Sequence, residues 1–71
     1  MTYEVKNNNI RAWVSDTREI ISLDAGIVVN VEQIGSRYNG IFKERSEGSL
    51  ALGTLEDGTR IEIQKINLRE V

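Results

Sequence analysis

The chain of 71 residues contains no cysteine, no histidine and no proline. Without cysteine, no disulfide can staple the chain and no thiolate can bind a metal or attack a substrate. Without histidine, the side chain most often used as a general base and as a zinc ligand is missing. We therefore expect a protein that is not an enzyme by itself and that carries no metal and no cofactor.

Long apolar runs and a strong net charge are absent as well. No stretch approaches the ~20 apolar residues that span a bilayer, and residues 1–6 lack the basic flank and apolar segment of a signal peptide. The formal net charge is −2, so no overall cationic field draws the chain onto nucleic acid or an anionic membrane. These features favour a protein with no membrane association, and the absence of cysteine fits a reducing, cytoplasmic environment.

The residues that are present favour β-structure. Isoleucine and valine are the commonest apolar residues, and β-branched side chains pack well on pleated surfaces. The clearest strand covers residues 27–33, where Ile27, Val29 and Val31 would face a core and the residues between them would face out. No internal repeat or low-complexity tract interrupts the chain.

Two readings compete for the turn that follows this strand. We predict a loop at Gly35-Ser36, which places Val29 opposite Phe42 and turns both Tyr38 and Phe42 inward. The alternative is a turn at Asn39-Gly40, a dipeptide typical of type I′ turns. We disfavour it because it leaves a short, polar strand before the turn.

A second hairpin is predicted around Asp57-Gly58. A two-residue loop there pairs Leu52 with Ile63 and Thr54 with Ile61 on one face of the sheet. The loop before this hairpin is expected at residues 46–48. Glu62 would point to the opposite face, towards solvent.

The parity of the apolar residues changes after this hairpin. Ile61 and Ile63 are odd, whereas Ile66 and Leu68 are even. We place a bulge or tight turn at Gln64-Lys65, because a phase change puts side chains on the wrong face unless the chain is interrupted. A last strand is expected from residue 66 to about residue 71.

The first quarter of the chain is less regular. Residues 7–9 form a polar loop, and the alternation of Ile10, Ala12 and Val14 indicates a strand. Residues 16–19 have the spacing of a capping box, which favours a short helix. Ile20-Ile21 favours a strand instead, and both readings stay open.

The predicted architecture is all-β. About five strands with short loops are best accommodated by a small SH3-like or Sm-like barrel, with an extra N-terminal strand or short helix. Residues 1–71 would form one domain, with residues 26–71 as the barrel core and 1–25 as an N-terminal extension. An open meander that dimerises through an edge is the alternative.

From about Gly26 onward the pattern resembles the small C-terminal β-barrel domain of bifunctional biotin protein ligases. The shared features are a valine-rich strand, a strand glycine, a glycine opening a leucine-rich strand, an acidic-glycine turn and a closing Leu-Arg strand. In this chain they are Val28-Val29-Asn30-Val31, Gly40, Gly48-Ser49-Leu50-Ala51-Leu52, Asp57-Gly58 and Ile66-Asn67-Leu68-Arg69. The spacing from Gly40 to Gly48 is one residue short of that pattern. Sm-like RNA-binding proteins and the C-terminal domain of ribosome maturation factors share much of it.

This resemblance implies a non-catalytic accessory module that assists a catalytic partner domain. It also implies that Arg69, on the closing strand, lies near the partner's nucleotide site. The alternative function is that of an Sm-like or ribosome-associated RNA-binding barrel. A protein partner, either a catalytic domain or a second copy of the chain, is favoured over nucleic acid.

Candidate interaction residues come from two groups that combine basic and aromatic side chains, a composition that can bind single strands. One group is Arg37, Tyr38, Lys43 and Arg45, and the other is Arg11, Trp13 and Arg18. An outward Trp13 would anchor an interface, supported by outward apolar residues. The predicted interaction surface consists of Trp13, Arg11, Val28, Ile41, Arg37 and Lys43. The carboxylates of Glu44, Glu47, Glu56, Asp57 and Glu62 are expected to be solvated rather than catalytic.

Overall fold

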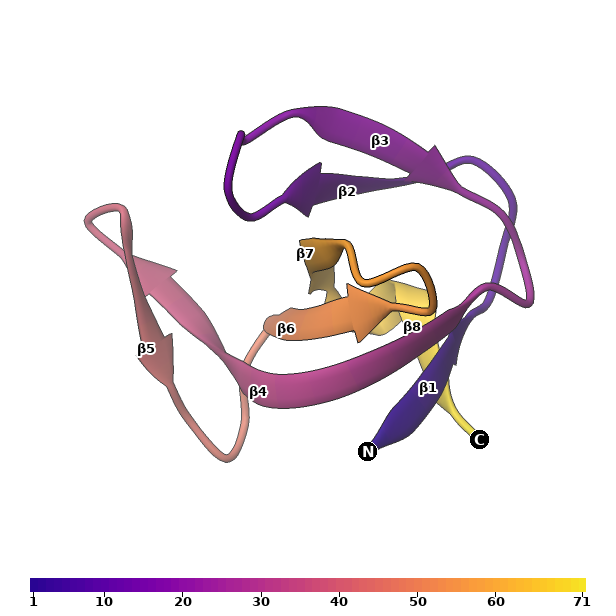
Figure 1. Cartoon of the computed structure of the whole chain (residues 1–71). Coiled ribbons are helices and arrows are strands. Elements are labelled where there is room, and N and C mark those ends of the chain that lie inside the picture. The colour runs from indigo at the N-terminus through magenta and orange to yellow at the C-terminus, as the bar shows by residue number, and fades with distance from the viewer.

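A computed structural model describes residues 1–71, which form one antiparallel sheet curled into a half-barrel (Figure 1). The strands are β1 (Thr2–Val5), β2 (Ile10–Val14), β3 (Ile20–Leu23), β4 (Val28–Tyr38), β5 (Ile41–Glu44), β6 (Leu50–Leu55), β7 (Arg60–Gln64) and β8 (Leu68–Glu70). A single 3-10 turn, η1 (Lys65–Asn67), precedes β8. The predicted all-β class is confirmed. The segment left open between helix and strand is the strand β3.

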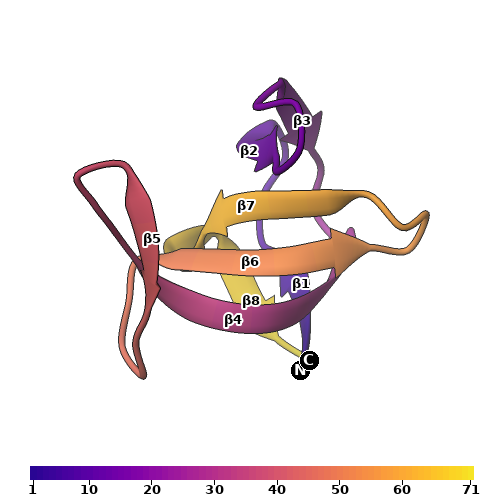
Figure 2. The same ribbon diagram turned by 60° about the vertical axis from the view of Figure 1, so that its left-hand side comes forward.

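The strand order is β3-β2-β7-β6-β4-β1-β8, and β5 pairs only with β4. The first and last strands are therefore neighbours, and the two termini lie side by side (Figures 1 and 2). The Val71 amide donates to the Thr2 carbonyl at 3.2 Å. Because the order ends at β3 and β8, the sheet curls without closing, and these two strands are its edges together with β5.

Ten buried apolar side chains fill the inside of the half-barrel. They are Tyr3, Val5, Ala12, Leu23, Val29, Val31, Ala51, Ile61, Ile63 and Leu68. The inward positions predicted for Val29, Val31, Ile61 and Ile63 are confirmed. Ile27 was predicted to face the core, but it precedes β4 and is 40% exposed. Residues 1–25 supply four of the ten side chains, which pack with those of 26–71 in one core.

The hairpin between β4 and β5 turns at Asn39-Gly40, so the prediction of a loop at Gly35-Ser36 was wrong. Both turn residues have positive φ, 52° and 79°, as a type I′ turn requires. Tyr38 pairs with Ile41 across the turn and is 60% exposed rather than inward. The polar strand before the turn persists because β4 pairs with β6 and β5 along this stretch.

Leu55 and Thr59 close the turn between β6 and β7, which therefore spans three residues, 56–58, rather than the predicted two. The Leu55 amide donates to the Thr59 carbonyl at 2.8 Å, and Gly58 adopts φ 93°, which is the arrangement of a turn followed by a glycine bulge. This extra residue shifts the register by one, so that Ile61 faces Gly53 rather than Thr54. Leu52 consequently lies on the outer face, opposite Glu62.

The interruption predicted at Gln64-Lys65 is confirmed as the 3-10 turn η1. The last strand begins at Leu68 rather than at Ile66, which is 76% exposed on the turn. The turn changes the phase of the chain, so Leu68 enters the core beside Val5, its partner on β1. The predicted loops at 7–9 and 46–48 also lie outside the strands.

A β-bulge bends β4 in its middle. The register with β6 shifts between Val31 and Gln33, so Glu32 is the additional residue. Bulges bend a strand and increase its twist. Beyond the bulge, β4 stays paired with β6 as far as Gly35, and its last residues carry β5 out to one side, which is visible in Figure 2.

Candidate functional site: a groove between two hairpins

The outer face of the sheet carries a groove between two hairpins. Its floor is the outer face of β6 and β7, one wall is the β4–β5 hairpin, and the other is the β2–β3 hairpin with its turn at residues 15–19. The cavity has two adjoining parts, of about 610 Å³ and about 310 Å³. Ser15, Arg37 and Glu62 line both parts, so the groove is continuous.

The two parts differ in the side chains that line them. We call the larger part the acidic half, because Asp16, Glu32 and Glu44 surround it with Arg60. We call the smaller part the aromatic half, which is lined by Trp13, Arg18 and Leu50 in addition to the shared residues. The register Leu52–Glu62–Trp13 across β6, β7 and β2 places these residues on the same outer face.

A salt bridge between Arg37 and Glu62 crosses the groove. The Arg37 Nε donates to Glu62 Oε2 at 2.9 Å, and its Nη2 donates to Oε1. The Nη1 donates to the Gly40 carbonyl at 2.7 Å. The hydrogen bond to Glu62 raises the pKa of Arg37, which therefore stays cationic. This pair fastens the β4–β5 hairpin to the floor of the groove.

Glu62 is the only charged residue buried in the structure, with 8% of its surface exposed. The prediction that its carboxylate would be solvated was wrong. It does face away from the core, but the β4–β5 hairpin covers the outer face at this point. A buried carboxylate needs hydrogen-bonding partners to offset the loss of water, and Arg37 supplies two donors in bidentate geometry.

Glycine allows the hairpin to fold across the sheet. A Cβ atom on Gly35 would overlap the Lys43 carbonyl and the Phe42 ring, and a Cβ on Gly48 would overlap the backbone of Gly35. The chain thus crosses itself at two residues without side chains. This close approach positions Arg37, two residues beyond Gly35, over Glu62.

The opposite wall is fixed by backbone hydrogen bonds. The Ser15 amide donates to the Arg60 carbonyl at 2.9 Å, which ties the turn to β7. The Arg18 amide donates to the Val14 carbonyl at 2.8 Å, and Arg18 adopts φ 64°. The Glu19 amide donates to the Thr17 hydroxyl at 3.2 Å. Both walls are therefore held by specific contacts rather than by loose loops.

Of the predicted interaction residues, Trp13 and Arg37 line the groove, and Trp13 is half-buried. Ile41 and Lys43 lie on the face of the β4–β5 hairpin opposite to Arg37, because they pair with Tyr38 and Ser36. The remaining two lie apart from the groove. Arg11 is exposed on β2 opposite Ser22, and Val28 is half-buried on β4 opposite Glu4.

Arg69, assigned by resemblance, lies on the edge strand β8. Its Nε donates to Glu4 Oε1 at 3.0 Å, and both side chains are partly exposed. In the strand order β1 separates β8 from β4, so Arg69 is outside the groove. It forms the second of two salt bridges in the structure.

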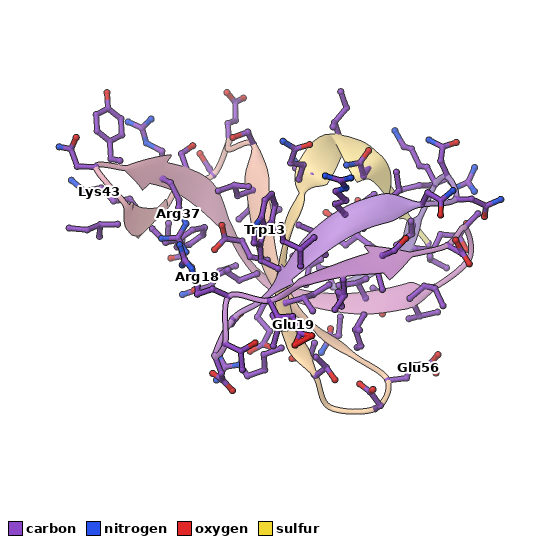
Figure 3. The ribbon with its side chains drawn as sticks, turned by 90° about the horizontal axis from the view of Figure 1, so that it is seen from above. Trp13, Arg18, Glu19, Arg37, Lys43 and Glu56 are labelled. Carbon is purple, nitrogen blue, oxygen red and sulfur yellow. The ribbon has the colours of Figure 1, made fainter.

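The two predicted basic and aromatic groups are rearranged in space. Trp13, Arg18 and Arg37 gather between the β4–β5 hairpin and β2, whereas Lys43 lies farther out on the hairpin (Figure 3). Arg45 follows β5 and lines a depression near Met1 that adjoins the acidic half and shares Glu32, Gln33 and Glu44 with it. The groove thus contains basic side chains of both groups, Arg37 and Arg18, whereas Arg11, Lys43 and Arg45 lie outside it.

Sequence reasoning missed Asp16, Glu32, Leu52 and Arg60 as groove residues. Asp16 was assigned to a capping box and Leu52 to the core. Neither assignment could be avoided without the register of β6 and the position of the β2–β3 turn. No sequence signal marked Glu62 either, because a charge between two inward isoleucines is ordinarily solvated on the outer face, and only the β4–β5 hairpin buries it there.

Together, the fold and the groove define a small all-β half-barrel with a cavity lined by charged side chains on its outer face. Comparisons of the chain with protein families, with curated proteins and with solved structures find no match. The structure has no helix with the length and apolar character needed to cross a bilayer. It also has no group of three or more histidine, cysteine, aspartate or glutamate side chains placed to share a metal ion.

Proposed function

We propose that this chain is a non-catalytic interaction module that binds an extended segment of a partner protein in the groove. The observation that carries the proposal is the groove itself, whose two walls are held over a floor of sheet by the Arg37–Glu62 pair. A cavity with fixed walls is prepared for a ligand, so little conformational entropy is lost on binding.

The charges of the groove favour a cationic protein segment over nucleic acid. In the acidic half, Glu62 is neutralised by Arg37, which leaves Asp16, Glu32 and Glu44 against Arg60, a net charge of −2. This charge attracts lysine or arginine and repels phosphate. Of the basic hairpin group, Tyr38 and Lys43 lie on the face turned away from the groove. The RNA-binding alternative therefore has less support.

A non-catalytic role is supported by the chemistry of the groove. Its one buried carboxylate is occupied by two hydrogen bonds from Arg37. A general acid or base needs a free group within reach of the substrate. The chain has neither histidine nor cysteine to take that role.

The groove can be tested by titration with a short peptide, using Trp13, the only tryptophan, as the reporter. We expect a peptide of leucine, serine and one lysine to change the emission of Trp13 in a saturable way. Replacing the lysine by glutamate should remove binding. The variant Glu44→Gln should weaken lysine-peptide binding, whereas Glu47→Gln, outside the groove, should not.

A short single-stranded RNA serves as the competing ligand in the same titration. Saturable, salt-dependent binding of the RNA, with no response to the lysine peptide, would overturn the proposal in favour of the RNA-binding barrel. The absence of any response to either ligand would also count against the groove as a binding site.

The resemblance to the biotin protein ligase domain extends this proposal to one kind of partner, a catalytic domain that the module assists. Arg69 and Glu4 form a partly exposed pair on β8 and β1, outside the groove, that would be available to such a partner. The test is to add the chain to a ligase catalytic domain with biotin and ATP. Greater retention of the adenylate, lost in Arg69→Glu, would support this partner, and an unchanged adenylate would reject it.

A further inference from the structure

We propose that the groove binds two charged groups of one segment: a lysine or arginine side chain in the acidic half and a carboxylate in the aromatic half. The carboxylate is either the C-terminus of the partner segment or an aspartate or glutamate side chain within it. The inference rests on the proposed function, because it assumes that the groove binds a protein segment. It adds the chemistry of the second contact and the direction in which the segment lies.

The aromatic half has a cation without a partner. The structure contains two salt bridges, Arg37–Glu62 and Arg69–Glu4, and Arg18 takes part in neither. Arg18 nevertheless lines the aromatic half together with Trp13 and Leu50. With Glu62 balanced by Arg37, this half carries a net charge of +1.

The backbone of Arg18 is held in the turn, which places its exposed side chain at the aromatic half. Its φ of 64° lies in the left-handed region, and its amide is bonded to the Val14 carbonyl at 2.8 Å. In Figure 3 its side chain lies beside that of Arg37, with Trp13 next to them. A guanidinium offers planar paired donors that match a carboxylate, and an adjacent apolar surface reduces competition from water.

The two halves share one segment because they are continuous. Ser15, Arg37 and Glu62 line both, and the Arg37–Glu62 pair lies at their junction. The acidic half carries −2 and the aromatic half +1, so the groove is electrically polar along its length. A segment with a cation at one point and a carboxylate at another therefore binds in one direction, and the reverse direction brings like charges together.

The test uses four matched peptides of about eight residues, which span roughly 25 Å when extended. The molecule itself measures 30 × 25 × 19 Å, so this length matches its middle dimension. The first peptide carries one lysine and a free C-terminal carboxylate, and the second is its amide. The third is an amide with an aspartate as its last residue, and the fourth has the lysine replaced by glutamine. Binding is measured by calorimetry and by Trp13 emission.

We expect amidation to weaken binding about tenfold, the scale of one lost charge-assisted hydrogen bond. If the aspartate amide restores the affinity, a side-chain carboxylate is accepted as well, and if it does not, the site is specific for the C-terminus. In Arg18→Gln the free acid and the amide should bind equally. Lys6→Gln, which removes one cation outside the groove, should keep the tenfold difference.

The outcomes separate this inference from the function beneath it. If none of the peptides binds, both the groove function and the two-charge reading fail. If the lysine peptides bind but the free acid and the amide do so equally, only the carboxylate contact is wrong. The same conclusion follows if Arg18→Gln keeps the full difference between them.

Discussion

At the scale of single residues, Arg37 and Glu62 are the most consequential pair in the molecule. The Glu62 side chain is 11% exposed and that of Arg37 is 29% exposed, so the ion pair is largely withdrawn from water. In such pairs the desolvation of the charges offsets much of their attraction. The pair is therefore better understood as a device that positions the hairpin than as a large net source of stability.

Removing only one partner exposes the cost of that desolvation. We expect Arg37→Met to lower the free energy of unfolding by about 2–4 kcal/mol, because Glu62 is left buried without a donor. The double variant Arg37→Met, Glu62→Leu should recover most of this loss. Urea denaturation measures both effects, and a single variant as stable as the parent chain would contradict the role assigned to the pair.

A second residue-scale prediction concerns Asp57 in the turn between β6 and β7. The Thr59 amide donates to Asp57 Oδ1 at 2.9 Å, and this hydrogen bond lowers the pKa of Asp57 below its ordinary value of 3.8. A lowered pKa means that the contribution to stability is present above the unfolded pKa and is lost as the pH falls through the folded pKa.

The loss of stability at low pH should accordingly depend on Asp57. In thermal melts from about pH 6 to about pH 2, the parent chain should lose stability relative to Asp57→Asn as the carboxylate is protonated. Above about pH 5, the advantage of the parent should be constant. If the stability of the two proteins depends on pH in the same way, the turn hydrogen bond does not favour the charged form of Asp57 over the protonated form.

At the scale of elements, the β4–β5 hairpin shows how local and long-range preferences combine. The Asn39-Gly40 turn follows the local preference for positive φ, and it was the alternative that the sequence reasoning disfavoured. The deciding factor was the pairing of residues 33–35 with β6, which supports a polar strand that is weak by itself. Gly35 has a different role, since the chain passes too close to it for any side chain.

This close approach makes Gly35 a sensitive position. We expect Gly35→Ala to cost about 1–3 kcal/mol, because the added methyl group forces the hairpin away from Gly48 and the Lys43 carbonyl. The displaced hairpin should also change the environment of Trp13 across the groove. Ser36→Ala, at the next residue, is the control, and unfolding curves together with Trp13 emission report both effects. Equal stability of the two variants would contradict the tight crossing.

At the scale of the whole molecule, the half-barrel depends on both ends of the chain. β1 is paired on one side with β4 and on the other with β8, and its inward side chains Tyr3 and Val5 belong to the core. A small domain has few buried side chains, so each contributes a large share of the net stability. The N-terminal strand is thus part of the packing that supports the groove.

Shortening a buried side chain of β1 tests whether the stability of the molecule depends on this strand. Val5 is fully buried, and Val5→Ala should lower the free energy of unfolding by about 1–3 kcal/mol through lost burial and the cavity left behind. Val28→Ala, at a half-buried outer position, should cost less. A cooperative urea transition with a smaller loss at Val5 than at Val28 would contradict the placement of β1 in the core.

The pattern of residues alone was sufficient for the β class, for the inward positions of Val29, Val31, Ile61 and Ile63, and for the break after Gln64. These features follow from local propensity and from the two-residue period of a strand, and both depend only on residues that are close together in the sequence. The register was not available in this way. One additional residue in the loop at 56–58 moved Leu52 to the outer face, and the choice of Asn39-Gly40 moved Tyr38 out of the core.

The groove depended on tertiary structure entirely. Four groove residues that are distant in the chain meet in space: Trp13, Arg18, Arg37 and Glu62. They meet because the bulge in β4 and the close backbone contact between Gly35 and Gly48 fold the β4–β5 hairpin across the outer face of β6 and β7. Composition and periodicity report which residues prefer burial and extended backbone. Which strand lies beside which, and which polar side chains then share a cavity, is decided by the packing energy of the complete sheet.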